Sequence, residues 1–298
     1  MKKAIFTGSC VAIVTPMHAD GSINFSALKN LLEVQIASGT DAICICGTTG
    51  EASTLTDEEH LEAVSFTVDT VAHRVPVIAG TGSNDTRHAI AMSRQAKSLG
   101  ADALLLVTPY YNKTSQDGLI RHFTSIVDAA CLPAILYNVP SRTGVTIKPE
   151  TYAILARHPL IVATKEASGD LAAIARTAAL CGEELGLYSG NDDQIVPVLS
   201  LGGLGVVSVL ANVAPAVTHR MCQLYFEGNV EASRALQLAY MPLIGALFSD
   251  VNPIPVKAAL DLMGLEGGPC RLPLAPLSAA LTQRLQQELA ACGLLERS

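Results

Sequence analysis

The sequence is poor in charged and aromatic residues. Charged residues make up 16% of the 298 positions, aromatic residues make up 4%, and there is no tryptophan. Hydrophobic residues nevertheless reach 49%, so the chain can bury a large core and does not have the composition of a disordered protein. The net charge of −7 and the lack of a basic run argue against nucleic acid as a partner.

The usual sequence signals for a membrane protein or for secretion are also missing. No apolar run approaches the ~18 residues that a membrane-spanning helix needs. Lys2 and Lys3 resemble the start of a signal peptide, but Thr7, Gly8 and Ser9 interrupt the apolar region that would have to follow. We therefore expect a cytoplasmic protein without a membrane partner.

Cysteine and histidine are present, but they form no recognisable metal or disulfide pattern. The eight cysteines include no C-x-x-C pair, and the seven histidines are dispersed. We therefore expect neither a disulfide framework nor a metal site. Cys44 and Cys46 are two positions apart, so both are expected to lie on one face of a strand as small core residues.

A glycine followed by a short apolar segment recurs along the chain. The pattern appears at 39–45, at 100–107 and, more loosely, at 203–209. It is typical of a helix that ends at glycine and is followed by a buried strand. Helix starts are indicated by a capping box at Thr56 and by Ser115, Pro149, Ser168 or Asp170, and Asp192. The sequence thus predicts eight strands, at 10–14, 42–45, 77–79, 103–107, 134–137, 161–164, 187–189 and 205–209.

Eight strands separated by helices predict a (β/α)8 barrel, the TIM barrel fold. The alternative is an open doubly wound sheet, but Gly80 and Gly82 lack the third glycine of its dinucleotide-binding fingerprint. After Gly228 the strands stop, and helices are expected at 230–248, 253–263 and 276–292. We therefore expect two domains: residues 1–228 form the barrel with the active site, and residues 229–298 form a C-terminal helical region.

Lys165 is unusual because it ends a predicted buried strand. Desolvation disfavours the charged form of a lysine, and a neutral amine can form a Schiff base with a carbonyl substrate. The alternatives are an ion pair with Glu166, the next residue, or a side chain that extends to the surface. The rest of the chain favours the catalytic interpretation.

Clusters of polar, aromatic and glycine residues follow the predicted strands. They lie at 47–51 after the second strand, 108–112 after the fourth, 137–144 after the fifth and 189–192 after the seventh. The active site of a TIM barrel is built at the carboxyl ends of its strands, so these clusters should meet Lys165 at one rim.

Each cluster offers a chemical function. Thr48 and Thr49 add two hydroxyls to a glycine-rich turn, which suits a carboxylate ligand. Tyr137 can shuttle protons during imine formation, and Arg142 can bind a second carboxylate. Each has a structural alternative. The threonines can belong to a tight turn, Tyr137 can be a rim aromatic whose hydroxyl donates to a backbone carbonyl, and Arg142 can be a surface arginine.

Tyr110 and Tyr111 are adjacent, so they cannot both face the same way. We expect one of them to face away from the pocket of its own chain. A pair of tyrosines at the rim, in a chain with few aromatic residues, is typical of a subunit interface.

Taken together, these segments closely resemble the dihydrodipicolinate synthase family of the pyruvate-dependent class I aldolase superfamily. The resemblance covers essentially the whole chain, and its most specific part is Ser-Arg-Thr-Gly at 141–144 after Tyr-Asn-Val-Pro. The other matching segments are 47–51, 108–112, 165–167, 189–190 and 252–257.

The resemblance implies a lyase that condenses pyruvate with L-aspartate 4-semialdehyde in lysine and diaminopimelate biosynthesis. It implies a pyruvate imine on Lys165, with no cofactor and no metal, and a homotetramer built from two tight dimers. Tyr137 is the expected proton donor and acceptor, and Thr48 links it to Tyr111 of the partner subunit. The substrate-binding residues implied are Thr49 and Val207 for pyruvate, Gly190 near the Schiff base and Arg142 for the semialdehyde carboxylate.

The resemblance also implies a regulatory pocket, with one departure. His60, Asn84 and Tyr110 match the residues that bind lysine in lysine-inhibited relatives, whereas Asp57 and His88 stand where those relatives have a histidine and a glutamate. Because an acidic partner for an ammonium group is replaced by a possible cation at position 88, we expect weak inhibition by lysine unless Asp57 compensates.

Two other functions are weighed against this one. The first is cleavage of N-acetylneuraminate or a 2-keto-3-deoxy sugar acid by a superfamily relative, against which the arginine fork of Arg142 argues. The second is a non-catalytic barrel, which would be expected to lose the nucleophile or the relay, yet Lys165, Tyr137, Thr48 and Tyr111 are all present.

Overall fold

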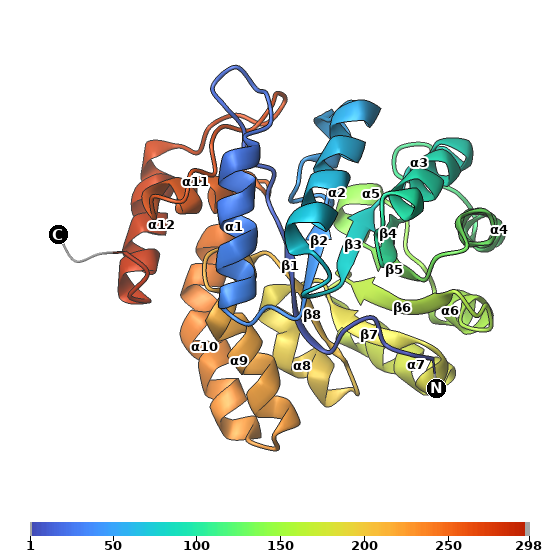
Figure 1. Ribbon diagram of the computed structural model, residues 1–298. Helices are drawn as coiled ribbons and strands as arrows, with labels where there is room; N and C mark the ends of the chain where they lie inside the picture. Colours follow the sequence, from blue (N-terminus) through green and yellow to red (C-terminus); the bar gives the residue numbers. More distant parts are fainter. Residues whose placement is uncertain (1, 296–298) are drawn as a thin grey trace.

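The computed structural model describes residues 2–295, which form a closed barrel of eight parallel strands surrounded by helices (Figure 1). The first strand pairs with both the second and the eighth, which closes the barrel. The predicted (β/α)8 fold is confirmed. The strands are β1 (Gly8–Ala12), β2 (Ala42–Ile45), β3 (Val77–Gly80), β4 (Ala103–Val107), β5 (Ala134–Asn138), β6 (Ile161–Glu166), β7 (Gly186–Ser189) and β8 (Gly205–Ser208).

The helices begin where the sequence provides caps. The Thr56 hydroxyl accepts from the Glu59 amide, and the Glu59 carboxylate accepts from the Thr56 amide, so the capping box is present. Helices around the barrel are α1 (Phe25–Ala37), α2 (Asp57–Val71), α3 (Thr86–Ser98), α4 (Gln116–Ala130), α5 (Pro140–Thr143), α6 (Pro149–Leu155), α7 (Leu171–Cys181), α8 (Ile195–Ser200) and α9 (Pro215–Phe226).

Tertiary contacts explain two of the observed boundaries. Of the two predicted helix starts at 168 and 170, Asp170 caps α7, because the Ser168 hydroxyl donates to Glu166 instead. Strand β1 ends at Ala12 rather than at position 14. The side chain of Asn212 replaces a neighbouring strand there, since it accepts from the Val14 amide at 3.1 Å and donates to the Ala12 carbonyl at 2.9 Å.

Side chains alternate between the barrel interior and the helical layer. Cys44 packs inside the barrel with Cys10, whereas Cys46 packs in the core between strands and helices. The expectation that Cys44 and Cys46 share one face is therefore wrong. The strand ends at Ile45, and Cys46 adopts a left-handed φ of 54°, which brings its Sγ to 3.7 Å from the His60 carbonyl.

Polar contacts hold the amino-terminal end of the barrel, and we call them the floor contacts. The Lys2 amine donates to the carbonyls of His158 at 2.7 Å and Ile161 at 2.8 Å, and also to that of Ala156. Asp41, just before β2, accepts from the Ser9 amide of β1 at 2.7 Å. These contacts lie at the end of the barrel opposite Lys165.

Three further helices follow the barrel: α10 (Val230–Leu247), α11 (Ile254–Leu262) and α12 (Ala279–Ala291). Figure 1 shows α10 beside α9, with α11 and α12 completing an orange and red helical region. The predicted boundary at 228 falls in the turn between α9 and α10, and the division into two domains stays a prediction. Within residues 2–295, no helix is both long and apolar enough to cross a bilayer.

Candidate active site

Lys165 lies on β6 with its side chain inside the barrel and is only 5% exposed. Its register partner on β5 is Tyr137, and the Lys165 Nζ lies 4.3 Å from the centroid of the Tyr137 ring. Within residues 2–295 the Lys165 amine forms no ion pair. The amine is thus buried beside a phenol, and no carboxylate of the described residues lies within ion-pair distance of it.

Glu166 does not pair with Lys165, because the next residue of a strand faces the opposite side. Its carboxylate accepts hydrogen bonds from the Tyr152 hydroxyl at 2.6 Å, from Asn138 Nδ2 at 3.0 Å and from the Ser168 hydroxyl at 2.9 Å. Burial raises the pKa of Glu166, and these donors oppose that effect. The ion pair considered from the sequence is therefore absent.

The barrel interior around Lys165 contains two cysteines. Cys10 and Cys44 are fully buried there and remain free thiols. Burial raises the pKa of Cys44 to about 11, with the charge of Lys165 as a smaller opposing influence. Both thiols therefore stay protonated near neutral pH and do not offer the amine a negative partner.

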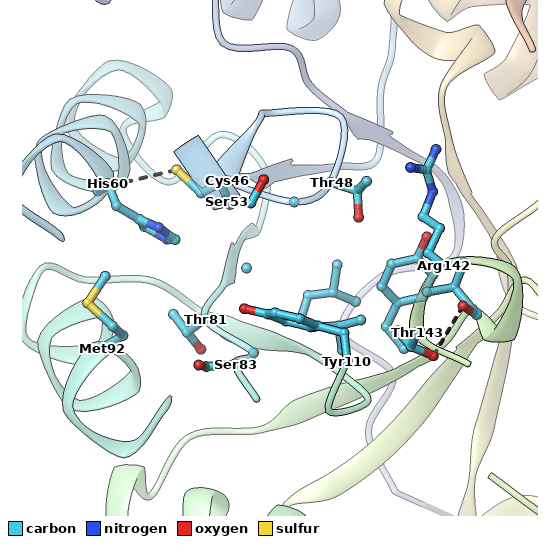
Figure 2. Close-up of a pocket in the computed structure, with 18 of the residues that line it drawn as sticks. Cys46, Thr48, Ser53, His60, Thr81, Ser83, Met92, Tyr110, Arg142 and Thr143 are labelled. Atoms are coloured by element: carbon cyan, nitrogen blue, oxygen red, sulfur yellow. Dashed lines mark hydrogen bonds between the residues drawn. The ribbon is translucent and has the colours of Figure 1, made fainter. Parts of the chain in front are cut away.

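A cavity of about 300 Å³ opens beside this interior (Figure 2). Figure 2 shows His60 and Met92 at one end of the cavity and Arg142 and Thr143 at the other. The predicted residues that line it are Thr48, Tyr137, Arg142, His60, His88 and Tyr110. Because Tyr137 lines the cavity and also contacts Lys165, it connects the buried amine to the open space.

The turn after β2 holds the two threonines in different settings. Thr49 is 2% exposed and accepts a hydrogen bond from Asn252 Nδ2 at 2.9 Å, whereas Thr48 lines the cavity. Gly80 permits this turn to approach β3, since a Cβ there would lie 2.3 Å from the Cys46 carbonyl oxygen. Among the described residues no hydrogen bond joins Thr48 to Tyr137.

Arg142 lies on α5, directly after β5, and its side chain is exposed at the cavity. Its Nη2 donates to the Asn252 carbonyl at 3.4 Å. Within the described part of the chain, Arg142 is not in an ion pair, so its guanidinium remains available to an anionic ligand.

Gly190 approaches Lys165 from β7, which pairs with β6 on the side opposite β5. The Gly190 amide donates to the Glu166 carbonyl at 2.6 Å, and a Cβ at position 190 would lie 3.0 Å from Lys165 Cγ. Glycine is therefore required for this close approach. Val207 lies on β8 inside the barrel, opposite Cys10, and is 1% exposed.

Comparison with known proteins agrees with this geometry. A model of the Dihydrodipicolinate synthetase family matches residues 5–292. The chain belongs to this family.

Relatives within the family are similar over their whole length. The 4-hydroxy-tetrahydrodipicolinate synthase of Thermoanaerobacter sp. (strain X514) is 54% identical over 295 residues, which cover 99% of each chain. That of Clostridium perfringens (strain SM101 / Type A) is 54% identical over 292 residues, covering 98% of this chain and 100% of the relative.

Solved structures of the family are also close. Dihydrodipicolinate synthase from Thermotoga maritima has a TM-score of 0.96 and 42% identity, covering 98% of this chain and 100% of that one. The chloride-inhibited enzyme from Acinetobacter baumannii, complexed with pyruvate, has a TM-score of 0.95 and 43% identity. The match covers 97% of this chain and 99% of that one.

Three of the residues expected to have a regulatory role, His60, His88 and Tyr110, line the cavity, and His60 lies at the end away from Arg142 (Figure 2). His60 is 8% exposed, burial lowers its pKa, and its Nε2 has no hydrogen-bond partner among the described residues. Asn84 donates to the Tyr110 carbonyl at 3.2 Å. His88 Nε2 lies 2.9 Å from Asp57 Oδ1, so the two departures found in the sequence form a pair with each other.

Tyr111 is not brought into the site of its own chain. Its side chain is 92% exposed and its φ is +66°, whereas the neighbouring Tyr110 lines the cavity. The two tyrosines therefore face different ways.

Two polar residues of the site received no functional role from the sequence. Asn252 contacts both Thr49 and Arg142, whereas in the sequence it belongs only to the family-matching segment 252–257. Asp192, expected as a helix start and as part of the rim cluster at 189–192, begins the short 3-10 helix η3 (Asp192–Gln194), and its Oδ2 accepts from the amides of Val209 and Leu210. The rim cluster marked the position of Asp192, but the sequence assigned no chemical role to its side chain.

Proposed function

We propose that this protein is a 4-hydroxy-tetrahydrodipicolinate synthase, a lyase that condenses pyruvate with L-aspartate 4-semialdehyde in lysine and diaminopimelate biosynthesis. The observation that carries this proposal is the buried amine of Lys165 beside Tyr137 in a member of the Dihydrodipicolinate synthetase family. The relatives that match nearly the whole chain carry this name.

The chemistry begins at Lys165. Its neutral amine attacks the keto carbon of pyruvate, and loss of water gives the imine. Removal of a proton from the pyruvate methyl group gives an enamine, which attacks the aldehyde carbon of the semialdehyde. The substrate amino group then replaces Lys165 on the former keto carbon, which closes the ring and frees the enzyme. No cofactor is needed, because the imine itself accepts the electron pair.

Tyr137 moves the protons of these steps. Its phenol lies at the cavity and its ring contacts the Lys165 amine, so it can serve both the water that leaves and the hydroxyl that forms. Thr48 extends the path from Tyr137 along the cavity wall. Tyr111 of the partner subunit completes the relay.

The substrate carboxylates have separate partners. Thr49 and the backbone around Val207 bind pyruvate, and the Gly190 carbonyl lies close to the imine, as the approach of Gly190 to Lys165 supports. Arg142 binds the carboxylate of the semialdehyde, for which its unpaired guanidinium is suited. An arginine fork is a poor match for a neutral sugar chain, which disfavours cleavage of a keto sugar acid.

The assembly that we propose is a homotetramer, a dimer of tight dimers. Tyr111 supports this proposal. Its side chain is 92% exposed and lies outside the cavity of its own chain. An aromatic side chain at a rim of this kind is typical of a subunit interface.

The deciding experiment follows product formation from pyruvate and L-aspartate 4-semialdehyde through a coupled reductase. We expect turnover by the unmodified protein and none by Lys165→Ala, together with an adduct on Lys165 that borohydride traps when pyruvate is present. A folded protein that traps pyruvate but does not turn over the semialdehyde would contradict the assignment of the second substrate. A protein that traps no pyruvate would contradict the Schiff-base mechanism.

A further inference from the structure

Asn252, which lies outside the barrel, touches both residues that we assign to substrate carboxylates. Its Nδ2 donates to the Thr49 hydroxyl at 2.9 Å, and its backbone carbonyl accepts from Arg142 Nη2 at 3.4 Å. Asn252 is 6% exposed and precedes α11 of the C-terminal helical region. One residue therefore links the pyruvate side of the site to the semialdehyde side.

The hydrogen bond from Asn252 determines what the Thr49 hydroxyl can do. A hydroxyl has one hydrogen to donate and can accept two hydrogen bonds. Because Asn252 Nδ2 is a donor only, Thr49 accepts from it and keeps its own hydrogen for another acceptor. The carboxylate of pyruvate is such an acceptor, so Asn252 holds Thr49 in the role of a donor to substrate.

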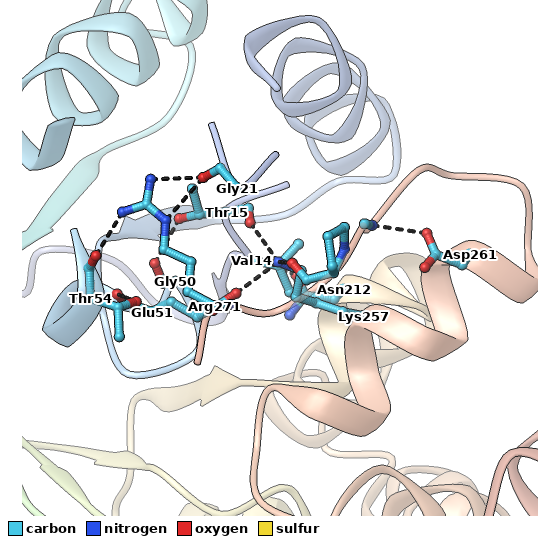
Figure 3. A network of polar contacts seen from close by, with 12 residues as sticks. Val14, Thr15, Gly21, Gly50, Glu51, Thr54, Asn212, Lys257, Asp261 and Arg271 are labelled. Carbon is cyan, nitrogen blue, oxygen red and sulfur yellow. Dashed lines mark hydrogen bonds and ion pairs between the residues drawn. The ribbon is translucent and has the colours of Figure 1, made fainter. Parts of the chain in front are cut away.

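A second buried contact fixes the segment that carries Asn252 (Figure 3). Lys257, on α11, is 1% exposed and donates to Glu51 Oε1 at 2.7 Å, to the Thr15 carbonyl at 3.0 Å and to the Pro269 carbonyl at 2.6 Å. All three hydrogens of the ammonium are used. Since Glu51 is two positions after Thr49, α11 and the threonine turn are held together at two points.

The other amide atom of Asn252 is unused. Its Oδ1 is buried and has no hydrogen-bond partner among the described residues. Folded proteins rarely leave a buried acceptor without a partner, and an exception calls for an explanation such as a bound group. A second polar atom of the same side chain is thus free for a donor of a bound molecule.

We propose that Asn252 is a positioning residue of the site, and that through it the C-terminal helical region sets the affinity for pyruvate and orients Arg142 for the second substrate. This inference rests on the proposed function. Asn252 itself does not exchange protons or form bonds with the reacting atoms; it acts through Thr49 and Arg142.

The test compares two variants of similar size, Asn252→Leu and Asn252→Asp, with pyruvate as the only substrate. Borohydride trapping on Lys165, followed by mass spectrometry at increasing pyruvate concentration, gives the half-saturating concentration. We expect this concentration to rise about tenfold in both variants, as for the loss of one hydrogen bond to a charged ligand. Steady-state kinetics should show the effect mainly in KM for pyruvate, with a smaller change in kcat.

The pH dependence separates a positioning role from general damage. The carboxylate introduced by Asn252→Asp accepts from Thr49 and repels the substrate carboxylate, but its protonated form can donate to Thr49 again. The affinity of Asn252→Asp, relative to the unmodified protein, should therefore recover as the pH falls from about 8 toward about 4, the ordinary range of a carboxyl group, while that of Asn252→Leu should not. A ratio that is flat with pH in both variants would overturn the proposal.

Val251→Ala is the matched control, since Val251 is the preceding residue and is 48% exposed. We expect it to trap pyruvate as the unmodified protein does. If the unmodified protein traps no pyruvate, the proposed function fails. If it traps pyruvate and both Asn252 variants have an unchanged half-saturating concentration, the positioning role alone fails. If Asn252→Leu does not fold, as judged by circular dichroism, the pH ratio of Asn252→Asp decides.

Discussion

Lys165 and Glu166 are adjacent in the sequence, yet their side chains lie on opposite faces of β6. Alternation along β6 directs the lysine into the barrel and the glutamate toward Tyr152 of α6. The sequence placed the lysine at a strand end, and the polar clusters after the other strands favoured a catalytic lysine over an ion pair with Glu166. The local segment alone could not show this, because the predicted strand ended at position 164 and the observed strand continues to Glu166.

Gly190 provides a test of how closely Lys165 must be held. In Gly190→Ala the new Cβ would lie 2.9 Å from Ala167 Cβ and 3.0 Å from Lys165 Cγ, so the lysine must shift. We expect kcat/KM to fall by about 100-fold, because misplacement of a reacting group by about 1 Å has an effect of that order. Steady-state kinetics measures this.

The control for this substitution is Gly245→Ala. A Cβ at Gly245 would meet its nearest neighbour, Arg284, at 3.7 Å, which is ordinary contact. Unchanged activity in Gly190→Ala would show that Lys165 tolerates the displacement.

Asp57 and His88 lead to a prediction about regulation by lysine. The Asp57 carboxylate already pairs with His88 at 2.9 Å, so it is not free to receive the ammonium group of a ligand. We therefore expect little inhibition by lysine, and we expect the double substitution Asp57→His and His88→Glu to increase it. Initial rates at rising lysine concentrations measure both. Strong inhibition of the unmodified protein at low millimolar lysine would contradict this expectation.

Asn252 marks the limit of what the sequence could reveal about single residues. Thr49 and Asn252 are 203 positions apart, and their hydrogen bond exists only because α11 packs against the turn after β2. Local patterns place residues on strands and turns, but they do not say which distant segment covers a turn.

At the scale of secondary structure, the prediction succeeded where hydrophobic patterns were supported by caps. The helix α2 begins after the predicted capping box, and β2 and β4 have the predicted bounds. It failed at β1, where the side chain of Asn212 replaces a strand, and it left the start of α7 open between Ser168 and Asp170, a choice that buried Glu166 decides by accepting from the Ser168 hydroxyl. Both cases depend on contacts that a local pattern does not contain.

Lys257 tests the contact between α11 and the threonine turn. Replacement by methionine leaves the carboxylate of Glu51 buried without its cation. Removing one partner of a buried pair lowers the free energy of unfolding by about 3–5 kcal/mol. Urea unfolding of Lys257→Met measures the loss, and Lys29→Met, at an exposed position of α1, is the control.

A partial recovery is expected in the double variant Lys257→Met and Glu51→Gln, because it removes the unpaired charge. If Lys257→Met is as stable as Lys29→Met, the pair does not support the turn.

Glu59 and Arg271 connect α2 to the segment before α12, and their pairing should make stability depend on pH. The hydrogen bond from Arg271 lowers the pKa of Glu59 from 4.5 to about 2. A carboxyl group with a lowered pKa stabilises the fold above its unfolded value, and this contribution is lost as the pH falls toward the folded value. We therefore expect Arg271→Met to be destabilised at neutral pH, and the difference to shrink as the pH falls from 4.5 to 2.

Urea unfolding midpoints at several pH values measure this difference. Arg121→Met serves as the comparison, because the Arg121–Asp117 pair is 80% and 69% exposed and should contribute little. A constant difference between Arg271→Met and the unmodified protein over this range would contradict the prediction.

At the scale of the whole molecule, the proposed relay requires Tyr111 to come from a partner subunit. Lys165→Ala and Tyr111→Phe should each be nearly inactive or slow. When the two are unfolded together and refolded, hybrid dimers contain one site with an intact Lys165 and an intact Tyr111 from the partner chain. We expect activity well above that of either variant alone. Measured rates equal to the average of the two parents would mean that Tyr111 does not act across the interface.

The floor contacts have a consequence for altering the enzyme. Lys2 and Asp41 hold the strands together at the end of the barrel that takes no part in the chemistry. Closure of the barrel therefore depends less on the loops at the rim. If Arg142 and Lys165 have the proposed roles, the segment that carries Arg142 can be randomised to accept a different aldehyde without changing the interior around Lys165. This chain would then be a suitable starting point for the directed evolution of new carbon–carbon bond formation.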